Sequence, residues 1–295
     1  MDTLSVELHA QIFEFAAALP LPVLAVEGLE QIRALTARLA PNPHYLRRVR
    51  HLYLADRKTT PDTLRAPHVH PASDADLLHY EETQTAAARL LVLAAPTLET
   101  LALAADCPFT GTALIAHLFA LELPHLRELA VRGFYPYPAG PYAEEPVMLR
   151  LERLYLEGNR NPHGLLTVSG LREACPALEQ LVISGVVAAQ GFANEAQTVV
   201  GYADGSADAG ADTDAPLPRG LRIVVRPGTI AKNAGGRMLR YHAKMLETLK
   251  RAADSSAGKL VLPRRPYPAD SKKSGADPMR ELWRERVAGG RGWWE

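Results

Sequence analysis

Cysteine is almost absent from this chain: Cys107 and Cys175 are its two cysteines among 295 residues. Two cysteines cannot build the disulfide framework of a small secreted domain, so we expect a reducing compartment, the cytoplasm or the nucleus. Both side chains are expected to be small buried apolar groups rather than redox centres or metal ligands.

Long apolar runs are missing as well. A membrane-spanning helix needs about 18 or more uninterrupted apolar residues, and no stretch of the sequence approaches that length. The opening segment MDTLSVELHA has acidic residues and no basic region, so no signal peptide is expected. With 47% hydrophobic content the chain can still bury a sizeable core. We predict a globular protein with no membrane partner.

The sequence also lacks the motifs of the common enzyme classes. It has no Gly-x-x-x-x-Gly-Lys-Ser/Thr loop, no Gly-x-Ser-x-Gly elbow and no His-Glu-x-x-His pair. The glycines of 224–237 follow a strand pattern but do not fit the dinucleotide fingerprint. We therefore predict that the chain is not an enzyme and has no catalytic residues, and we keep a nucleotide-binding or hydrolytic α/β protein as a remote alternative.

Two groups of side chains could suggest a metal, but neither has the spacing that a metal site needs. Three histidines lie in or near a Pro-rich segment without a cysteine or a positioned carboxylate: His68, His70 and His79. Four aspartates miss the spacing of a calcium-binding loop: Asp204, Asp208, Asp212 and Asp214. We predict no metal and no cofactor.

Net charge is zero, with 33 basic and 33 acidic residues, but the charge is unevenly distributed. Residues 1–218 carry 15 Lys and Arg against 26 Asp and Glu, whereas residues 219–295 carry 18 against 7. The basic end could bind an acidic partner or nucleic acid, or two ends of an elongated molecule could simply differ in their solvated faces. No basic motif interleaved with aromatic residues is present, which does not favour nucleic acid.

What the sequence does contain is a repeat. The same apolar spacing recurs in four stretches: Leu98–Leu101–Leu103, Leu126–Leu129–Val131, Leu151–Leu154–Leu156 and Leu178–Leu181–Ile183. Their middle members are 28, 25 and 27 residues apart, a period and local spacing typical of leucine-rich repeats. The pattern predicts an α/β fold, an irregular leucine-rich-repeat solenoid with parallel strands on one face and helices and loops on the other. Such an array is a surface for binding another protein.

Further elements flank the regular repeats. Val49, Leu52 and Leu54 match the spacing and predict a first strand, but Leu52 lies 49 residues before Leu101, about twice the period. Either one repeat has degenerated or a segment is inserted, and the composition favours an insertion near 57–75 followed by a helix at 76–93. Other expected helices are 5–19, 28–39, 111–122, 165–174, 236–254 and 278–287, and other expected strands are 221–225 and 259–262.

These patterns divide the chain into three parts. We expect a helical segment at 1–44, the irregular repeat domain at 45–262, and a tail with a short helix at 263–295. Besides 57–75, insertions are expected near 133–147, which is rich in Pro and Tyr, and near 188–218, whose acidic low-complexity core we expect to be mobile.

The N-terminal helix carries a family resemblance. Leu4-Ser-Val-Glu-Leu8-His-Ala-Gln-Ile12-Phe13 resembles the opening helix of an F-box, whose pattern is Leu-Pro-x-Glu-Leu-x-x-x-Ile-Phe. Together with the repeats, the chain resembles the F-box-like leucine-rich-repeat proteins abundant in fungi. That resemblance implies a substrate-recognition adaptor of a cullin-based ubiquitin ligase. By position, Leu4, Leu8, Ile12 and Phe13 would contact the Skp-type linker subunit, and the repeats would hold an unknown protein target.

An alternative stays open beside the adaptor. Ser5 stands where the F-box pattern has Pro, and the later half of that motif is absent. The N-terminal helices could instead cap the end of the repeat core, as solenoids require. The protein would then be a freestanding repeat scaffold without a ligase role.

The target would bind between the repeat leucines. Side chains alternate along a strand, so the residues between the leucines should point outward to solvent. The expected target-binding face comprises eight residues of the kind that anchor interfaces or flank such anchors: His51, Tyr53, Glu128, Arg132, Arg153, Tyr155, Glu157 and Gln180. An ordinary solvated sheet face is the alternative.

Overall fold

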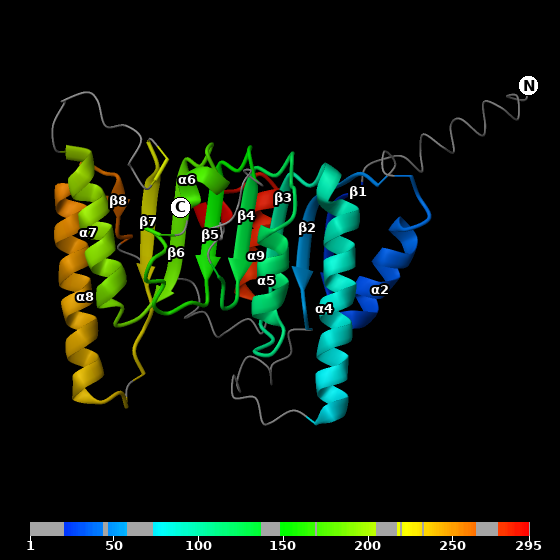
Figure 1. The fold of residues 1–295 in the computed structure, drawn as a ribbon, viewed down its shortest axis with the longest axis horizontal. Coiled ribbons are helices and arrows are strands. Elements are labelled where there is room, and N and C mark those ends of the chain that lie inside the picture. Colours follow the sequence, from blue (N-terminus) through cyan, green and yellow to red (C-terminus); the bar gives the residue numbers. More distant parts are fainter. Residues whose placement is uncertain are drawn as a thin grey trace, which may run out of the picture.

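The strands in the described part of the chain form one eight-stranded parallel sheet with helices packed on it (Figure 1). The computed structural model describes residues 21–43, 47–57, 73–136, 148–168, 170–204, 217–218, 220–231, 233–263 and 277–294. The strands follow one another across the sheet in chain order, and every neighbouring pair is parallel. The chain therefore is α/β, as the sequence predicts.

The repeat leucines align across the sheet in one column. Leu52 pairs with Leu101, Leu101 with Leu129, Leu129 with Leu154, and Leu154 with Leu181. The column spans five strands, β2 to β6. The strands of the sheet are β1 (Leu21–Glu27), β2 (Val49–Ala55), β3 (Thr100–Ala104), β4 (Glu128–Arg132), β5 (Arg153–Glu157), β6 (Gln180–Val186), β7 (Arg222–Pro227) and β8 (Leu260–Val261). Because β2 pairs directly with β3, the long interval between them holds a connection, as the composition suggested.

The connections place helices against one face of the sheet. In Figure 1, α4 and α5 lie in front of the strands, and α7 and α8 lie side by side at the β8 end of the sheet. Helix α2 packs against α4, and buried side chains of α7 and α8 belong to the same core as the strands. Their bounds are α2 (Gly28–Leu39), α4 (Asp74–Ala94), α5 (Gly111–Phe119), α6 (Leu171–Ala174), α7 (Gln190–Asp204) and α8 (Gly236–Ser255), with a 3-10 turn η2 (Ala95–Thr97) before β3. A capping box starts α4, because the Ser73 hydroxyl accepts from the Asp76 N–H while the Asp76 carboxylate accepts from the Ser73 N–H.

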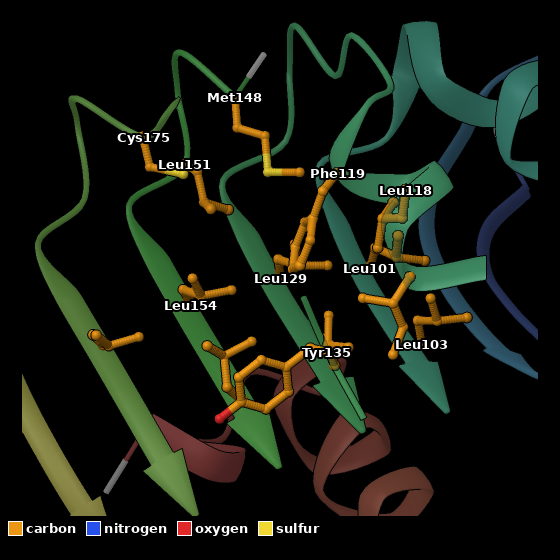
Figure 2. Close-up of a cluster of buried hydrophobic side chains, with 14 of the residues drawn as sticks. Leu101, Leu103, Leu118, Phe119, Leu129, Tyr135, Met148, Leu151, Leu154 and Cys175 are labelled. Atoms are coloured by element: carbon orange, nitrogen blue, oxygen red, sulfur yellow. The ribbon is translucent and has the colours of Figure 1, made fainter. Parts of the chain in front are cut away.

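The main core lies between this helical layer and the sheet. Figure 2 shows Leu101, Leu129 and Leu154 along the sheet, with Leu118 and Phe119 of α5 packed over them. The same cluster contains Cys175, and Cys107 is also buried, so the expectation that both cysteines are buried is confirmed. Burial raises the pKa of the Cys175 thiol to about 12, which keeps it a neutral apolar group.

The remaining two short elements lie on the opposite face. In Figure 1, α9 (Pro278–Val287) is seen behind the strands, and the 3-10 helix η4 (Gly292–Trp294) contacts α9. Asp277 caps the start of α9 by accepting from the Met279 N–H at 2.9 Å, and Pro278 fits the first helical position, which needs no donor. The helices expected at 28–39, 76–93, 111–122, 236–254 and 278–287 are thus confirmed, with ends shifted by a few residues.

Three expectations need correction. Residues 21–27 were expected inside a helical N-terminal segment but form β1, which pairs with β2 and extends the sheet. Much of the insertion expected near 188–218 is instead the helix α7, in which Phe192, Ala193, Ala196 and Val200 are buried at helical spacing. The helix expected at 165–174 is shortened to α6, because Gly170 adopts a left-handed φ of 63°.

Several expected features lie outside the described residues. They are the helix at 5–19 with Leu4, Leu8, Ile12 and Phe13, the histidines His68 and His70, the aspartates Asp208, Asp212 and Asp214, and the ranges 58–72, 137–147 and 205–216. Within the described part of the chain, no helix is both long and apolar enough to cross a membrane.

The leucine column generates a stability prediction. Leu154→Ala removes a fully buried side chain from the centre of the core, so the free energy of unfolding should fall by about 2–5 kcal/mol. Leu149→Ala, at a position 55% exposed, is the matched control and should change it by less than about 0.5 kcal/mol. Urea unfolding of both variants measures the difference, and equal effects would contradict the assignment of the column to the core.

Candidate interaction face and the segment that covers it

The sheet face opposite the helices is the expected target-binding face, and it is not open to solvent. Tyr53 and Tyr155 are completely buried, and so are Ala102, Ala130 and Val182 in the same column. The expectation that this column points to solvent is therefore wrong. The alternation of side chains along each strand holds, but a second layer covers the outward side.

That second layer is α9 and η4 of the C-terminal segment, residues 277–294, which we name the covering segment. Its buried side chains are Met279, Trp283 and Trp293. The Trp283 ring lies 5.8 Å from the Tyr53 ring, and the Trp293 ring lies 5.9 Å from the Tyr155 ring, measured between centroids. Ala102 and Ala130 belong to the same cluster, and their small side chains leave room for the two indoles between the tyrosines. Each buried tryptophan removes roughly 150–250 Å² from water, worth about 4–6 kcal/mol before entropy is counted.

An ionic anchor holds the first turn of the covering segment. The Asp277 carboxylate accepts from the Tyr53 hydroxyl at 2.6 Å and pairs with the Arg132 guanidinium at 2.5 and 2.7 Å. Arg132 also pairs with Asp106, at 2.6 Å, so one cation bridges two carboxylates. Burial alone would raise the pKa of Asp277, but the hydrogen bonds and charge of Arg132 lower it below its ordinary value.

The pKa values of the two neighbouring groups, Tyr53 and Arg132, are raised instead of lowered. Burial, reinforced by the charge of Asp277, raises the pKa of Tyr53 and keeps its hydroxyl a donor. Burial would lower the pKa of Arg132, but the hydrogen bonds and charges of its two carboxylates raise it above the ordinary value. The anchor is therefore a fixed cation between fixed anions.

Glu128 forms a second anchor, halfway along the covering segment. It is buried, and it accepts from Arg286 at 2.5 and 2.8 Å, from the Trp294 indole at 3.1 Å and from Arg153 at 3.1 Å. Burial acts to raise the pKa of Glu128, but the bonds from Arg286 and Trp294 bring it below its ordinary value. Every oxygen of this carboxylate thus has a donor.

Single contacts fix the two margins of the covering segment. Arg280 pairs with Glu27 of β1 at 2.7 Å, and Arg226 of β7 donates to the Trp293 carbonyl at 3.0 Å. The segment thus bonds to strands from β1 to β7. Its arginines pair with acidic residues of the sheet, which accounts for part of the charge difference between the two ends of the chain.

Four of the eight expected target-binding residues remain at the margins. His51, Arg153, Glu157 and Gln180 are half-buried, and Glu157 accepts from the Tyr155 hydroxyl at 2.9 Å. Burial lowers the pKa of His51 below its ordinary value. Arg132 is also half-buried but is committed to the Asp277 anchor, whereas Tyr53, Glu128 and Tyr155 contact the covering segment.

Sequence reasoning missed the covering residues, namely Asp277, Met279, Trp283, Arg286 and Trp293. Two signals could have found them. The sheet column places two alanines between two tyrosines, a shape that receives large rings, and all three tryptophans of the chain lie in the tail among basic residues. Neither signal fixes which face a tail covers.

Two hollows open outside the covered face. One, of about 660 Å³, lies between α2 and α4 and is lined by both charged and apolar side chains, among them Arg33, Leu78 and Glu82. The other, of about 400 Å³, lies where β2 to β5 begin and is lined mainly by basic side chains. Among the described residues, no group of three or more His, Cys, Asp or Glu side chains could hold a metal ion.

In comparisons with protein families, with characterised proteins and with solved structures, no match to this chain was found.

The Asp277 anchor predicts the effect of one hydroxyl. Tyr53→Phe keeps the ring against Trp283 but removes the donor to Asp277, so the free energy of unfolding should fall by roughly 1–3 kcal/mol. Tyr241→Phe, at a ring 46% exposed on α8, is the matched control and should be neutral. Chemical denaturation compares them. A neutral Tyr53→Phe would mean that the hydroxyl contributes nothing to docking.

The same anchor predicts a pH dependence. Because the folded state lowers the pKa of Asp277, the carboxylate contributes stability above its unfolded pKa of about 3.8, and that contribution is lost as pH falls through the folded value. The wild-type chain should therefore exceed Asp277→Asn in stability by a constant margin above about pH 5. The margin should shrink below about pH 3.8. Denaturant titrations at several pH values measure it, and a margin independent of pH would contradict the assignment.

Proposed function

We propose that this chain is a protein-binding module of the leucine-rich-repeat type, and that it serves as an F-box-like substrate-recognition adaptor of a cullin-based ubiquitin ligase. The sheet itself is the observation that supports the first part of this proposal, the protein-binding module. Eight parallel strands follow in chain order, and the repeat leucines of β2 to β6 stand in one register column. Stacked repeats of this kind build extended surfaces for other proteins.

The surface left for a target differs from the one expected from the repeat pattern. The covering segment occupies the centre of the sheet face, so a target would contact the margin on which His51, Arg153 and Gln180 are half-buried. This margin carries basic and amide groups and follows the starts of the strands. We infer that recognition there is mainly polar, with hydrogen bonds and charge rather than a broad apolar patch.

The adaptor role depends on Leu4, Leu8, Ile12 and Phe13. Their spacing matches the F-box opening helix, and they would contact the Skp-type linker subunit. This part of the proposal draws its support from the sequence resemblance, because these residues lie outside the described part of the chain.

One observation favours the alternative of a freestanding scaffold. The later half of an F-box motif would follow the opening helix, but residues 21–39 form β1 and α2, which pair with β2 and pack on α4. That part of the chain belongs to the sheet and its helical layer. The linker-binding surface would then be limited to residues before 21.

A pull-down separates the two functions. Purified Skp-type linker subunit should retain the natural chain and should lose the variant Leu8→Asp plus Ile12→Asp, because two carboxylates cannot pack in an apolar interface. The control variant, Leu78→Asp plus Val168→Asp, alters two side chains that are 62% and 73% exposed and should bind like the natural chain. Failure of the natural chain to bind the linker would leave the scaffold as the function.

A further inference from the structure

The hollow at the start of β2 to β5 has an unusual set of lining residues. It encloses about 400 Å³ and is bordered by residues from four successive strand entries: Arg48, Arg50, Pro96, Thr97, Glu99, His125, Arg127 and Arg150. Neighbouring parallel strands lie about 4.8 Å apart, so these entries bring basic side chains from separate repeats to one place. Four arginines and a histidine thus face one carboxylate.

Two of the arginines have no ionic partner among the residues that the structure describes. Arg48 and Arg150 are exposed, and neither forms an ion pair with any residue in the described ranges. The Arg150 Nη1 lies 3.4 Å from the His125 Nδ1, within hydrogen-bond distance. A guanidinium has five N–H donors and no acceptor, so this one contact leaves Arg150 with donors for an anion.

The other two arginines, Arg50 and Arg127, form long ion pairs. Arg50 Nε lies 3.5 Å from Glu99 Oε1, and Arg127 Nη1 lies 3.8 Å from Glu152 Oε1, with all four side chains substantially exposed. Ion pairs of this kind contribute little in water, so both guanidinium groups can turn to a stronger anion at small cost. The planar fork of arginine fits the oxygens of a phosphoryl group in a bidentate manner.

The positive charge is local rather than extended. One row of strand entries is linked by backbone hydrogen bonds from each position to the next, and it mixes both charges: Arg50, Glu99, Arg127, Glu152, Glu179 and Arg222. A row interrupted by three glutamates opposes a long polyanion such as a nucleic acid strand, which needs a continuous basic track. It fits one compact anion seated over β2 to β5.

We propose that this hollow binds a doubly charged oxyanion, a phosphoryl group held by Arg48, Arg50, Arg127 and Arg150. Glu99 lies within the site and opposes the anion, so it limits affinity. The inference goes beyond the proposed function and does not depend on it, since a chain that binds no linker subunit could still hold an anion here. The phosphoryl group could belong to a phosphorylated side chain or to free phosphate or pyrophosphate.

Fluorescence anisotropy tests the site with a labelled peptide containing one phosphothreonine and with the same peptide unphosphorylated. The phosphopeptide should bind the full chain, the unphosphorylated peptide should not, and pyrophosphate or inorganic phosphate should compete. Arg48→Ala plus Arg150→Ala should weaken binding at least about tenfold. Glu99→Gln, which removes the opposing carboxylate, should tighten it by roughly two- to fivefold.

A control variant distinguishes a specific binding site from a general effect of positive charge. Arg240→Ala removes an exposed arginine of α8 that has no ion pair among the described residues, and it should leave the affinity unchanged. Binding by phosphate or pyrophosphate with no gain from the peptide would identify a free anion as the ligand. The proposal is overturned if no phosphoryl probe binds, if Arg240→Ala weakens binding as much as the double variant, or if a single-stranded oligonucleotide binds more tightly than every phosphoryl probe. Since Arg48, Arg150 and Arg240 are exposed and the Glu99 side chain is 41% exposed, the thermal unfolding midpoint should stay constant, and a lowered midpoint would identify a misfolded variant.

Discussion

The contact between the two tryptophans of the covering segment and the tyrosine and alanine face of the sheet decides what the rest of the molecule can be. A parallel sheet built from crossovers is normally buried on both faces. Here the helical layer covers the leucine side, while Trp283 and Trp293 cover the other. Without this contact, Tyr53, Tyr155 and the alanines between them would form an exposed apolar trough.

The same contact explains where the charged residues of the covering segment and of the sheet lie. A short segment docking on a sheet needs orientation as well as apolar area, and two carboxylates with complete sets of donors provide it. Asp277 fixes the start of α9 against β2 and β4, and Glu128 fixes its end together with η4. The acidic sheet and the basic tail, which in the sequence suggest an external partner, are to this extent partners of each other.

The sequence predicted the strands well because the local spacing of leucines directly reports burial on one side. Leu101, Leu129, Leu154 and Leu181 are in register as their spacing indicates, and α4, α8 and α9 follow from helical apolar patterns. β1 was missed although Leu21, Leu24 and Val26 have the repeat spacing, because this stretch lies inside a segment that was interpreted as helical. Local pattern could not predict that Tyr53 and Tyr155 would be buried. Alternation places a side chain on a face, but only the tail, more than 100 residues away in sequence, decides whether that face meets water.

The position of the covering segment in the chain has a consequence for how the protein is made. Arg280 bonds to Glu27 across 253 residues, and Asp277 accepts from Tyr53 across 224. Contacts between residues so far apart in sequence form late, because the chain must first lose the entropy of closing a long loop. During synthesis all eight strands leave the ribosome before residues 277–294 do, so the apolar trough stays uncovered until then. The nascent chain is therefore most prone to aggregation just before its covering segment emerges, and a premature stop after β8 would make that state permanent.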